Sequence, residues 1–268
     1  MDPFHDYYGI EWYLILMVWA AIALGSHFYQ VGFIVKLIRL GKDDHRFNSW
    51  TQRVTEFLTD WLGQRKVVED KVAGYAHALI FWGFLMLVSD VIDLGTGGLL
   101  RDILSIVKLD GIWNLVVEVG YFMAMIGILI ALFRRLVLRP EKLKGASIEG
   151  TLILVAILGI LLTAFIVQPD QMILETTDYN ASEPLRMLFA KEMEKMDHDT
   201  LRTVVDASFW LHMVLIGGFL IEIPQTKHSH LIGTTPNVMF QDHEKMGTML
   251  PLQAVSYTHL TLPTILLL

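Results

Sequence analysis

The chain has 268 residues, of which 53% are hydrophobic and 18% are charged, and its formal net charge is −7. This composition is too apolar for a soluble domain of this length, so we expect an integral membrane protein, and the acidic balance argues against binding to nucleic acid. The chain contains no cysteine, which excludes disulfides, cysteine-ligated zinc and any iron–sulfur cluster held by this chain alone.

Five segments are long and apolar enough to cross the hydrocarbon layer, which requires roughly 20 residues in a helix. The first follows acidic residues rather than a basic region and is too long for the core of a signal peptide, so we interpret it as a retained span. The expected fold is an all-α membrane protein, a bundle of five transmembrane helices. Their approximate bounds are 11–35, 72–92, 113–133, 149–167 and 203–223.

The distribution of Lys and Arg predicts the orientation of these spans, because cationic residues are retained on the cytoplasmic side of a membrane. Fifteen of them lie in the linker 36–71, the turn 134–144 and the tail that follows the fifth span, whereas the loops 93–112 and 168–202 together contain six. We therefore expect the N-terminus outside and the C-terminal tail in the cytoplasm.

The first linker contains the segment "RFNSWTQRVTEFLTDWLGQ" at 46–64, in which apolar residues recur at helical intervals between charged ones. This pattern is typical of an amphipathic helix. Such a helix would either lie on the membrane surface or connect the first two spans by packing on their cytoplasmic ends.

The last residues, "VSYTHLTLPTILLL" at 255–268, resemble the translation of a sequencing adapter. We therefore treat 255–268 as an artefact and exclude it from the fold, as a cloning scar would be excluded. On this interpretation, residues 1–240 form the membrane domain and residues 241–254 begin a cytoplasmic region that is cut short.

Five histidines lie inside the predicted spans or just beyond the last one: His27, His77, His212, His228 and His230. His212 is near the middle of its span, and the others fall in the cytoplasmic half. An imidazole at such a depth needs a polar partner, because an unsatisfied nitrogen costs on the order of several kcal/mol there.

Two interpretations account for these histidines. Imidazoles from facing helices can hold the iron of a porphyrin in a bundle core, where small residues let the flat macrocycle approach the backbone. Alternatively, the imidazoles form interhelical hydrogen bonds, and the small residues serve close helix packing. The small residues in question are Ala73, Gly74, Ala76, Ala78, Gly217 and Gly218. Lys227 and His228 lie where they would meet the propionates of a haem at the interface.

Two segments carry a family resemblance: "GYAHALIFWGFLML" at 74–87 and, more specifically, "WLHMVLIGGFLIEIPQTKHSHLIGTTPNVMF" at 210–240. They resemble the NarI-like cytochrome b domain of the gamma subunit of membrane-bound respiratory nitrate reductase. They are more similar still to the membrane domains of heterodisulfide-reductase-related iron–sulfur oxidoreductases. The five spans and the basic first linker match these proteins as well.

The resemblance implies a b-type haem held by His77 and His230 near the cytoplasmic face, and a second, more external haem bound by His212. The second-helix ligand that the family carries about ten residues after His77 is absent, because Leu87 stands there. Either His27 supplies this ligand, or His212 pairs with His77 around a single haem.

The resemblance further implies a module of the bacterial or archaeal cytoplasmic membrane that carries electrons between menaquinone or ubiquinone and a cytoplasmic iron–sulfur oxidoreductase. The clusters are expected in a C-terminal domain beyond this sequence or in a partner subunit. Electron-transfer flavoprotein or a thiol/disulfide system would be a further redox partner.

A protein of another class is the alternative: a cofactor-free transporter or membrane anchor whose histidines serve helix packing or proton relay. Paired Gly/Pro breaks within spans would favour a transporter. The relevant prolines, Pro140, Pro169 and Pro224, lie instead at the ends of spans.

Overall fold

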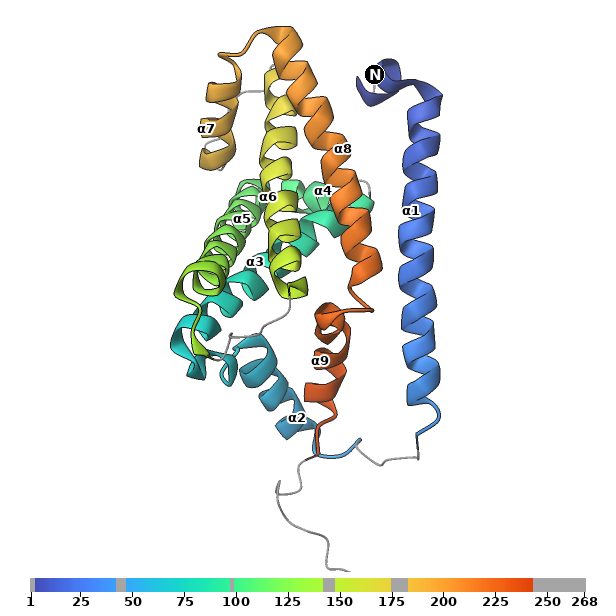
Figure 1. Cartoon of the computed structure of the whole chain (residues 1–268), viewed down its shortest axis with the longest axis vertical. Helices are drawn as coiled ribbons and strands as arrows, with labels where there is room; N and C mark the ends of the chain where they lie inside the picture. Colours follow the sequence, from blue (N-terminus) through green and yellow to red (C-terminus); the bar gives the residue numbers. More distant parts are fainter. Residues whose placement is uncertain (1–2, 42–46, 97–98, 142–147, 175–182, 243–268) are drawn as a thin grey trace, which may run out of the picture.

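The computed structural model describes residues 3–41, 47–96, 99–141, 148–174 and 183–242, and this part of the chain consists of helices and turns (Figure 1). Five of its helices are long and apolar enough to cross a membrane, as predicted. They are α1 (Pro3–Ile38), α3 (Lys71–Gly95), α5 (Asp110–Phe133), α6 (Glu149–Leu174) and α8 (His198–Glu222).

All five helices differ at one or both ends from the predicted spans, and α1 and α6 extend several residues further, to Pro3 and to Leu174. α5 continues beyond Phe133 as a π-helical turn, η3 (Arg134–Leu138). α8 begins at His198 rather than near residue 203, because the Asp197 carboxylate caps it by accepting a hydrogen bond from the Thr200 amide at 3.0 Å. Its first turns are polar, so hydropathy alone places the start too late.

α3 and α5 form the most closely packed helix pair, and glycines allow the approach. A Cβ atom added to Gly83 would lie 2.6 Å from the backbone of both Gly120 and Ala124, and one added to Gly127 would lie 2.7 Å from the carbonyl oxygen of Ala76. Small residues at a crossing let two apolar helices gain van der Waals contact in a bilayer, where burial supplies no hydrophobic driving force.

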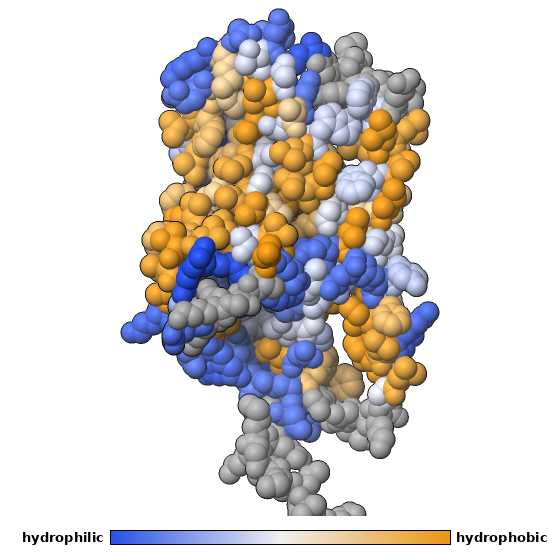
Figure 2. Space-filling model, viewed as in Figure 1, coloured by the Kyte–Doolittle hydropathy of each residue, from blue (hydrophilic) through white to orange (hydrophobic). Residues whose placement is uncertain are grey.

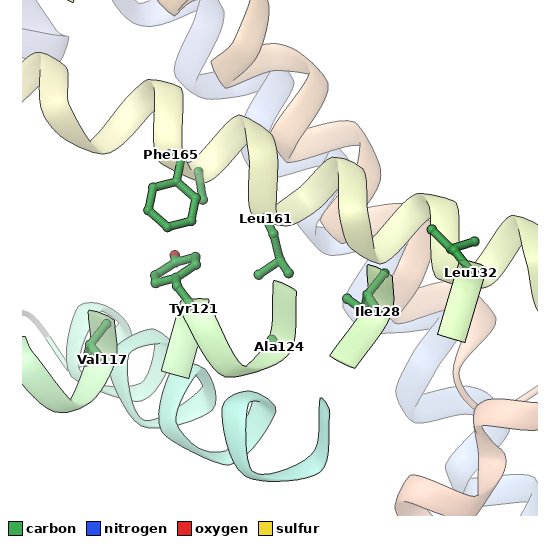
Figure 3. Packing of buried hydrophobic residues seen from close by; sticks show 8 residues of the cluster. Val117, Tyr121, Ala124, Ile128, Leu132, Leu161 and Phe165 are labelled. Atoms are coloured by element: carbon green, nitrogen blue, oxygen red, sulfur yellow. The ribbon is translucent and has the colours of Figure 1, made fainter. Parts of the chain in front are cut away.

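The hydrophobic core lies between α5 and α6 (Figure 3). Tyr121 on α5 faces Phe165 on α6, with ring centroids 5.0 Å apart, and Ile128 is buried two turns further along α5. The buried members of the cluster are Val117, Tyr121, Ala124, Ile128, Leu132, Leu161, Ala164 and Phe165.

α1 stands to one side of the bundle and packs against α8 (Figure 1). The Trp19 indole donates a hydrogen bond to the carbonyl of Met213 at 2.9 Å, and Trp12 packs on Trp210 with ring centroids 5.1 Å apart. The surface over the middle of the molecule is largely hydrophobic, whereas hydrophilic residues gather at both ends (Figure 2). This arrangement suits a lipid environment.

Short helical segments lie between the long helices in the sequence or follow the last of them. At the lower end of Figure 1, α2 (Trp50–Glu56) and the π-helical turn η1 (Phe57–Leu62) pack against α9 (His230–Met239). Part of the amphipathic segment of the first linker thus packs on neighbouring helices, whereas its residues Phe47, Trp50, Val54 and Leu58 are exposed. The other short segments are the 3₁₀ turn η2 (Val67–Glu69), α4 (Leu99–Ile106), α7 (Pro184–Met193) and the 3₁₀ turn η5 (Lys227–Ser229).

A buried carboxylate holds α7 in place at the upper end. Glu118 on α5 is 2% exposed and accepts hydrogen bonds from the backbone amides of Leu185 and Arg186, the latter at 3.0 Å. These amides belong to the first turn of α7, where no helical acceptor exists for them and where the helix dipole favours negative charge. Glu118 is therefore an interhelical cap.

Candidate functional site

The structure brings His77 and His230 together. His77 lies in the second turn of α3, and His230 is the first residue of α9, far away in the sequence. Their ring centroids are 6.3 Å apart, and the ring planes are inclined by 44°. Both residues are exposed in the structure.

The chain reaches His230 through a turn that the sequence specifies. Pro224 ends α8 because it has no amide hydrogen to continue the helix. Thr226 then caps η5 by accepting a hydrogen bond from the His228 amide at 3.3 Å. Within the turn, Nδ1 of His230 lies 2.6 Å from the carbonyl oxygen of Lys227. A carbonyl can only accept, so Nδ1 carries the proton and Nε2 keeps a free lone pair.

The donor set and the centroid spacing of this pair are compatible with two axial ligands of a haem iron. Metal–imidazole bonds are about 2 Å long, and a ring centroid lies roughly 1 Å behind its nitrogen, so one iron between two imidazoles separates the centroids by about 6 Å. The observed 6.3 Å agrees with this value. The Lys227 carbonyl also orients His230 in the way that outer partners orient metal-binding histidines.

Two imidazoles alone suit a porphyrin better than a free metal ion. The described part of the chain contains no group of three or more His, Asp or Glu side chains placed to hold a metal ion. A structural ion generally takes four or more protein ligands, whereas a porphyrin brings four nitrogens of its own and needs only axial ligands.

His228 lies beside the pair but faces a carboxylate. Its ring centroid is 6.0 Å from that of His230 and 5.1 Å from that of Phe219, and its Nδ1 is 3.4 Å from Oε2 of Glu222. Burial lowers the pKa of the His228 imidazole below its ordinary value, and Glu222 only partly offsets the effect. The contact of His228 and of the exposed Lys227 with haem propionates remains a prediction.

His212 and His27 each bond to a neighbouring helix. Nδ1 of His212 lies 2.8 Å from the hydroxyl of Thr163 on α6. That hydroxyl is also within reach of the Gly159 carbonyl at 2.8 Å, to which it can donate while accepting from His212. Nδ1 of His27 lies 2.9 Å from the carbonyl oxygen of Leu220 on α8.

The structure does not bring His27 and His212 together. His27 lies at the level of Leu220, which is eight residues beyond His212 on α8, or about 12 Å along a helix at 1.5 Å per residue. Axial ligands of one iron stand about half as far apart. His212 is likewise bonded to α6, whereas His77 faces α9.

Several small residues near these histidines serve helix packing. A Cβ atom added to Gly74 would overlap the backbone of Val67, and one added to Gly217 would overlap the Trp19 indole. Ala76 is buried against Gly127. Gly218 differs, because open space surrounds it.

Sequence reasoning did not predict the partners of Arg53 and Glu118, which are among the buried polar residues. Arg53 is 2% exposed although its helix is amphipathic, and its guanidinium binds backbone carbonyls of a distant segment. The only available signal was the position of Arg53 between apolar residues at helical spacing. Glu118 lies near the start of the predicted span 113–133, where an acid is tolerable without a protein partner, so the sequence did not reveal its bonds to α7.

The chain is similar in sequence to two curated oxidoreductases. It is 26% identical over 238 residues to "Probable iron-sulfur-binding oxidoreductase FadF" of Bacillus subtilis (strain 168), a match that covers 88% of this chain and 34% of that protein. It is 28% identical over 250 residues to "EtfAB:quinone oxidoreductase" of Syntrophomonas wolfei subsp. wolfei (strain DSM 2245B / Goettingen), covering 87% of this chain and 34% of that protein.

The chain thus spans about a third of the length of the curated relatives it matches. No family model matches it, and no solved structure does. The fold and these relatives together describe a helical module with five helices long and apolar enough to cross a membrane, similar in sequence to part of two curated oxidoreductases.

Proposed function

We propose that the chain is a membrane cytochrome b module that carries electrons between a quinone pool and an iron–sulfur oxidoreductase on the cytoplasmic side. The observation that carries the proposal is the His77–His230 pair, whose centroids are spaced as two axial ligands of one iron. The printed names of the two relatives support the redox role and the two kinds of partner.

In this proposal the five long helices cross the cytoplasmic membrane, with the N-terminus outside. The excess of Lys and Arg in the segments that join the lower ends of the helices supports this orientation. His77 and His230 then lie in the cytoplasmic half, near the surface at which a soluble redox partner would dock.

A b-type haem bound by His77 and His230 would supply one-electron transfer. The chain's own contribution is positional: α3 and α9 present the imidazoles, the Lys227 carbonyl fixes the tautomer of His230, and the apolar bundle excludes water. We assign a single haem to the chain, because His27 and His212 lie at different depths and each bonds to another helix.

Iron–sulfur clusters would belong to a further region or to a partner subunit, since this chain has no cysteine. One relative is named for iron–sulfur binding, the other for the electron-transfer flavoprotein EtfAB and quinone, and both are about three times as long as their match to this chain. Electron-transfer flavoprotein is therefore the soluble partner that we propose.

The test is a reduced-minus-oxidised absorption spectrum of the protein purified from haem-replete membranes. We expect the alpha band of a b-type haem in the wild type and its loss in His77→Ala and His230→Ala. His198→Ala is the matched control, because His198 is exposed at the opposite end of the molecule. A featureless wild-type spectrum would favour a cofactor-free transporter or anchor instead.

A further inference from the structure

The connector formed by α2 and η1 contacts the helices that carry both proposed ligands. On one side it packs against α9, which begins at His230. On the other side, Trp61 of η1 packs edge-on against Phe81 of α3 with ring centroids 5.2 Å apart. Phe81 lies one turn beyond His77 and therefore on the same face of α3.

α9 depends on such contacts for its position. It has only ten residues and includes Gly233 and Pro236, so it is too short and too poor in helix formers to be stable alone. The turn that precedes it is a single 3₁₀ turn. The direction of α9, and with it that of the His230 ring, must be fixed at its other end.

Arg53 provides that fixed point. Its guanidinium donates hydrogen bonds to the carbonyls of Met239 at 3.2 Å and Gln241 at 2.9 Å, at the C-terminal end of α9. It also donates to the carbonyl and side-chain oxygens of Asn48, at 2.7 and 2.9 Å. The side-chain amide of Gln241 in turn donates a hydrogen bond to the Glu56 carboxylate, and the Phe240 ring packs on the Phe47 ring.

A buried guanidinium is costly unless every donor is used and its charge is compensated. Here the carbonyls of Met239, the last residue of α9, and of Gln241 just beyond it accept from one nitrogen, Asn48 accepts from the other two, and the C-terminal end of α9 supplies the negative end of a helix dipole. A surface connector would need no such group. In some proteins buried polar groups of this kind select a single arrangement of the elements they join.

We infer that Arg53 is a positioning residue for His230: it clamps the far end of α9 so that the imidazole at the near end stays opposite His77. The inference rests on the proposed haem. Arg53 itself touches neither imidazole, so it acts through α9.

The test compares Arg53→Ala and Arg53→Lys with the wild type in the purified, haem-containing protein. The first readout is the rate at which haem passes to apomyoglobin, which we expect to rise about tenfold in Arg53→Ala, as for outer partners of other metal ligands. The second readout is the low-spin electron paramagnetic resonance spectrum, whose g values depend on the angle between the two imidazole planes. We expect these g values to shift.

Arg139→Ala is the matched control, because this exposed arginine at the same end of the bundle bonds through its side chain to the local carbonyl of Leu136 and to no other described residue. A merely structural role for Arg53 would lower thermal stability but leave the g values unchanged, and that result would overturn the inference. If Arg53→Ala does not fold, Arg53→Lys decides, since lysine keeps the buried charge but cannot reach all the acceptors. Wild-type g values and haem loss in Arg53→Lys would then refute the clamp.

These outcomes separate the inference from the proposed function. A wild-type protein without a haem spectrum would refute the proposed function itself. If the wild-type protein contains haem and the Arg53 variants keep both its g values and its rate of haem loss, only the positioning role is refuted.

Discussion

At the scale of single residues, His27 satisfies a carbonyl that a proline leaves without a donor. In α8 the carbonyl of Leu220 would accept from the amide of residue 224, but Pro224 has no amide hydrogen. Nδ1 of His27 lies 2.9 Å from that oxygen and donates to it. The histidine of α1 thus completes the hydrogen bonding of α8 where α8 ends.

We therefore expect His27→Ala to lower the stability of the protein by about 1 kcal/mol, as for other interhelical hydrogen bonds in membranes. The proposed haem spectrum should be unchanged. His27→Gln, which keeps a donor, should recover part of the loss. Thermal unfolding in detergent measures the stability. Loss of a haem signal in His27→Ala would instead identify His27 as a ligand.

A second prediction at this scale concerns Asp60 and pH. Burial acts to raise the pKa of Asp60, but the hydrogen bond and charge of Lys66 and the charge of Arg65, at 2.9 and 2.6 Å, outweigh burial and hold the pKa below its ordinary value of 3.8. The ionised form is thus favoured by folding. Its stabilising effect is present above the ordinary pKa and is lost as the pH falls through the lowered value.

We expect Asp60→Asn to be less stable than the wild type at neutral pH, and the difference to shrink as the pH falls from about 5 to about 3. Melting temperatures of both proteins across this range measure the effect. Asp199→Asn is the control, because the Asp199 side chain is fully exposed. A difference that stays constant with pH would contradict the assignment.

At the scale of elements, the packing of α1 on α8 depends on one glycine and not on its neighbour. Gly217 lies against the Trp19 indole, which is held by its bond to Met213. An added Cβ would overlap the indole, and moving the ring would break that bond. Gly218 has no atom of a neighbouring element within 4 Å of the added Cβ position.

Gly217→Ala should therefore destabilise the α1–α8 contact by about 1–3 kcal/mol, the usual cost of overpacking. Gly218→Ala adds the same methyl group in open space and should change stability little. Both are compared by thermal unfolding and by the fluorescence of Trp19 in otherwise Trp-free variants. Equal effects of the two substitutions would show that this interface tolerates displacement.

The sequence predicts the long helices well because each is defined by its own apolar composition. It predicts the connector less fully, since amphipathic spacing at 46–64 does not say whether lipid or protein covers the apolar side. It gives no indication of the clamp: Arg53 bonds to the backbone carbonyls of Met239 and Gln241, which any sequence would offer. The His77–His230 pairing was implied by family resemblance, and hydropathy alone could not have selected it among five histidines.

At the scale of the whole molecule, the outer surface of the bundle suits lipid. α1 is apolar around most of its circumference and is largely exposed apart from its contact with α8. A helix of this kind is stable in a bilayer and would be a liability in water. The glycine-lined contact of α3 with α5 and the interhelical hydrogen bonds of Trp19 and His27 are the interactions that hold helices together when lipid covers the rest.

The orientation of the molecule gives the last prediction. Because the chain has no cysteine, single cysteines introduced at exposed sites report their side of the membrane without background labelling. His198→Cys lies at the start of α8, and Glu141→Cys lies beyond η3 at the opposite end; neither change removes a Lys or Arg that sets the topology. A membrane-impermeant maleimide should label His198→Cys in intact cells and Glu141→Cys only after permeabilisation. The reverse pattern would put His77 and His230 in the outer half of the bilayer, out of reach of a cytoplasmic electron donor or acceptor.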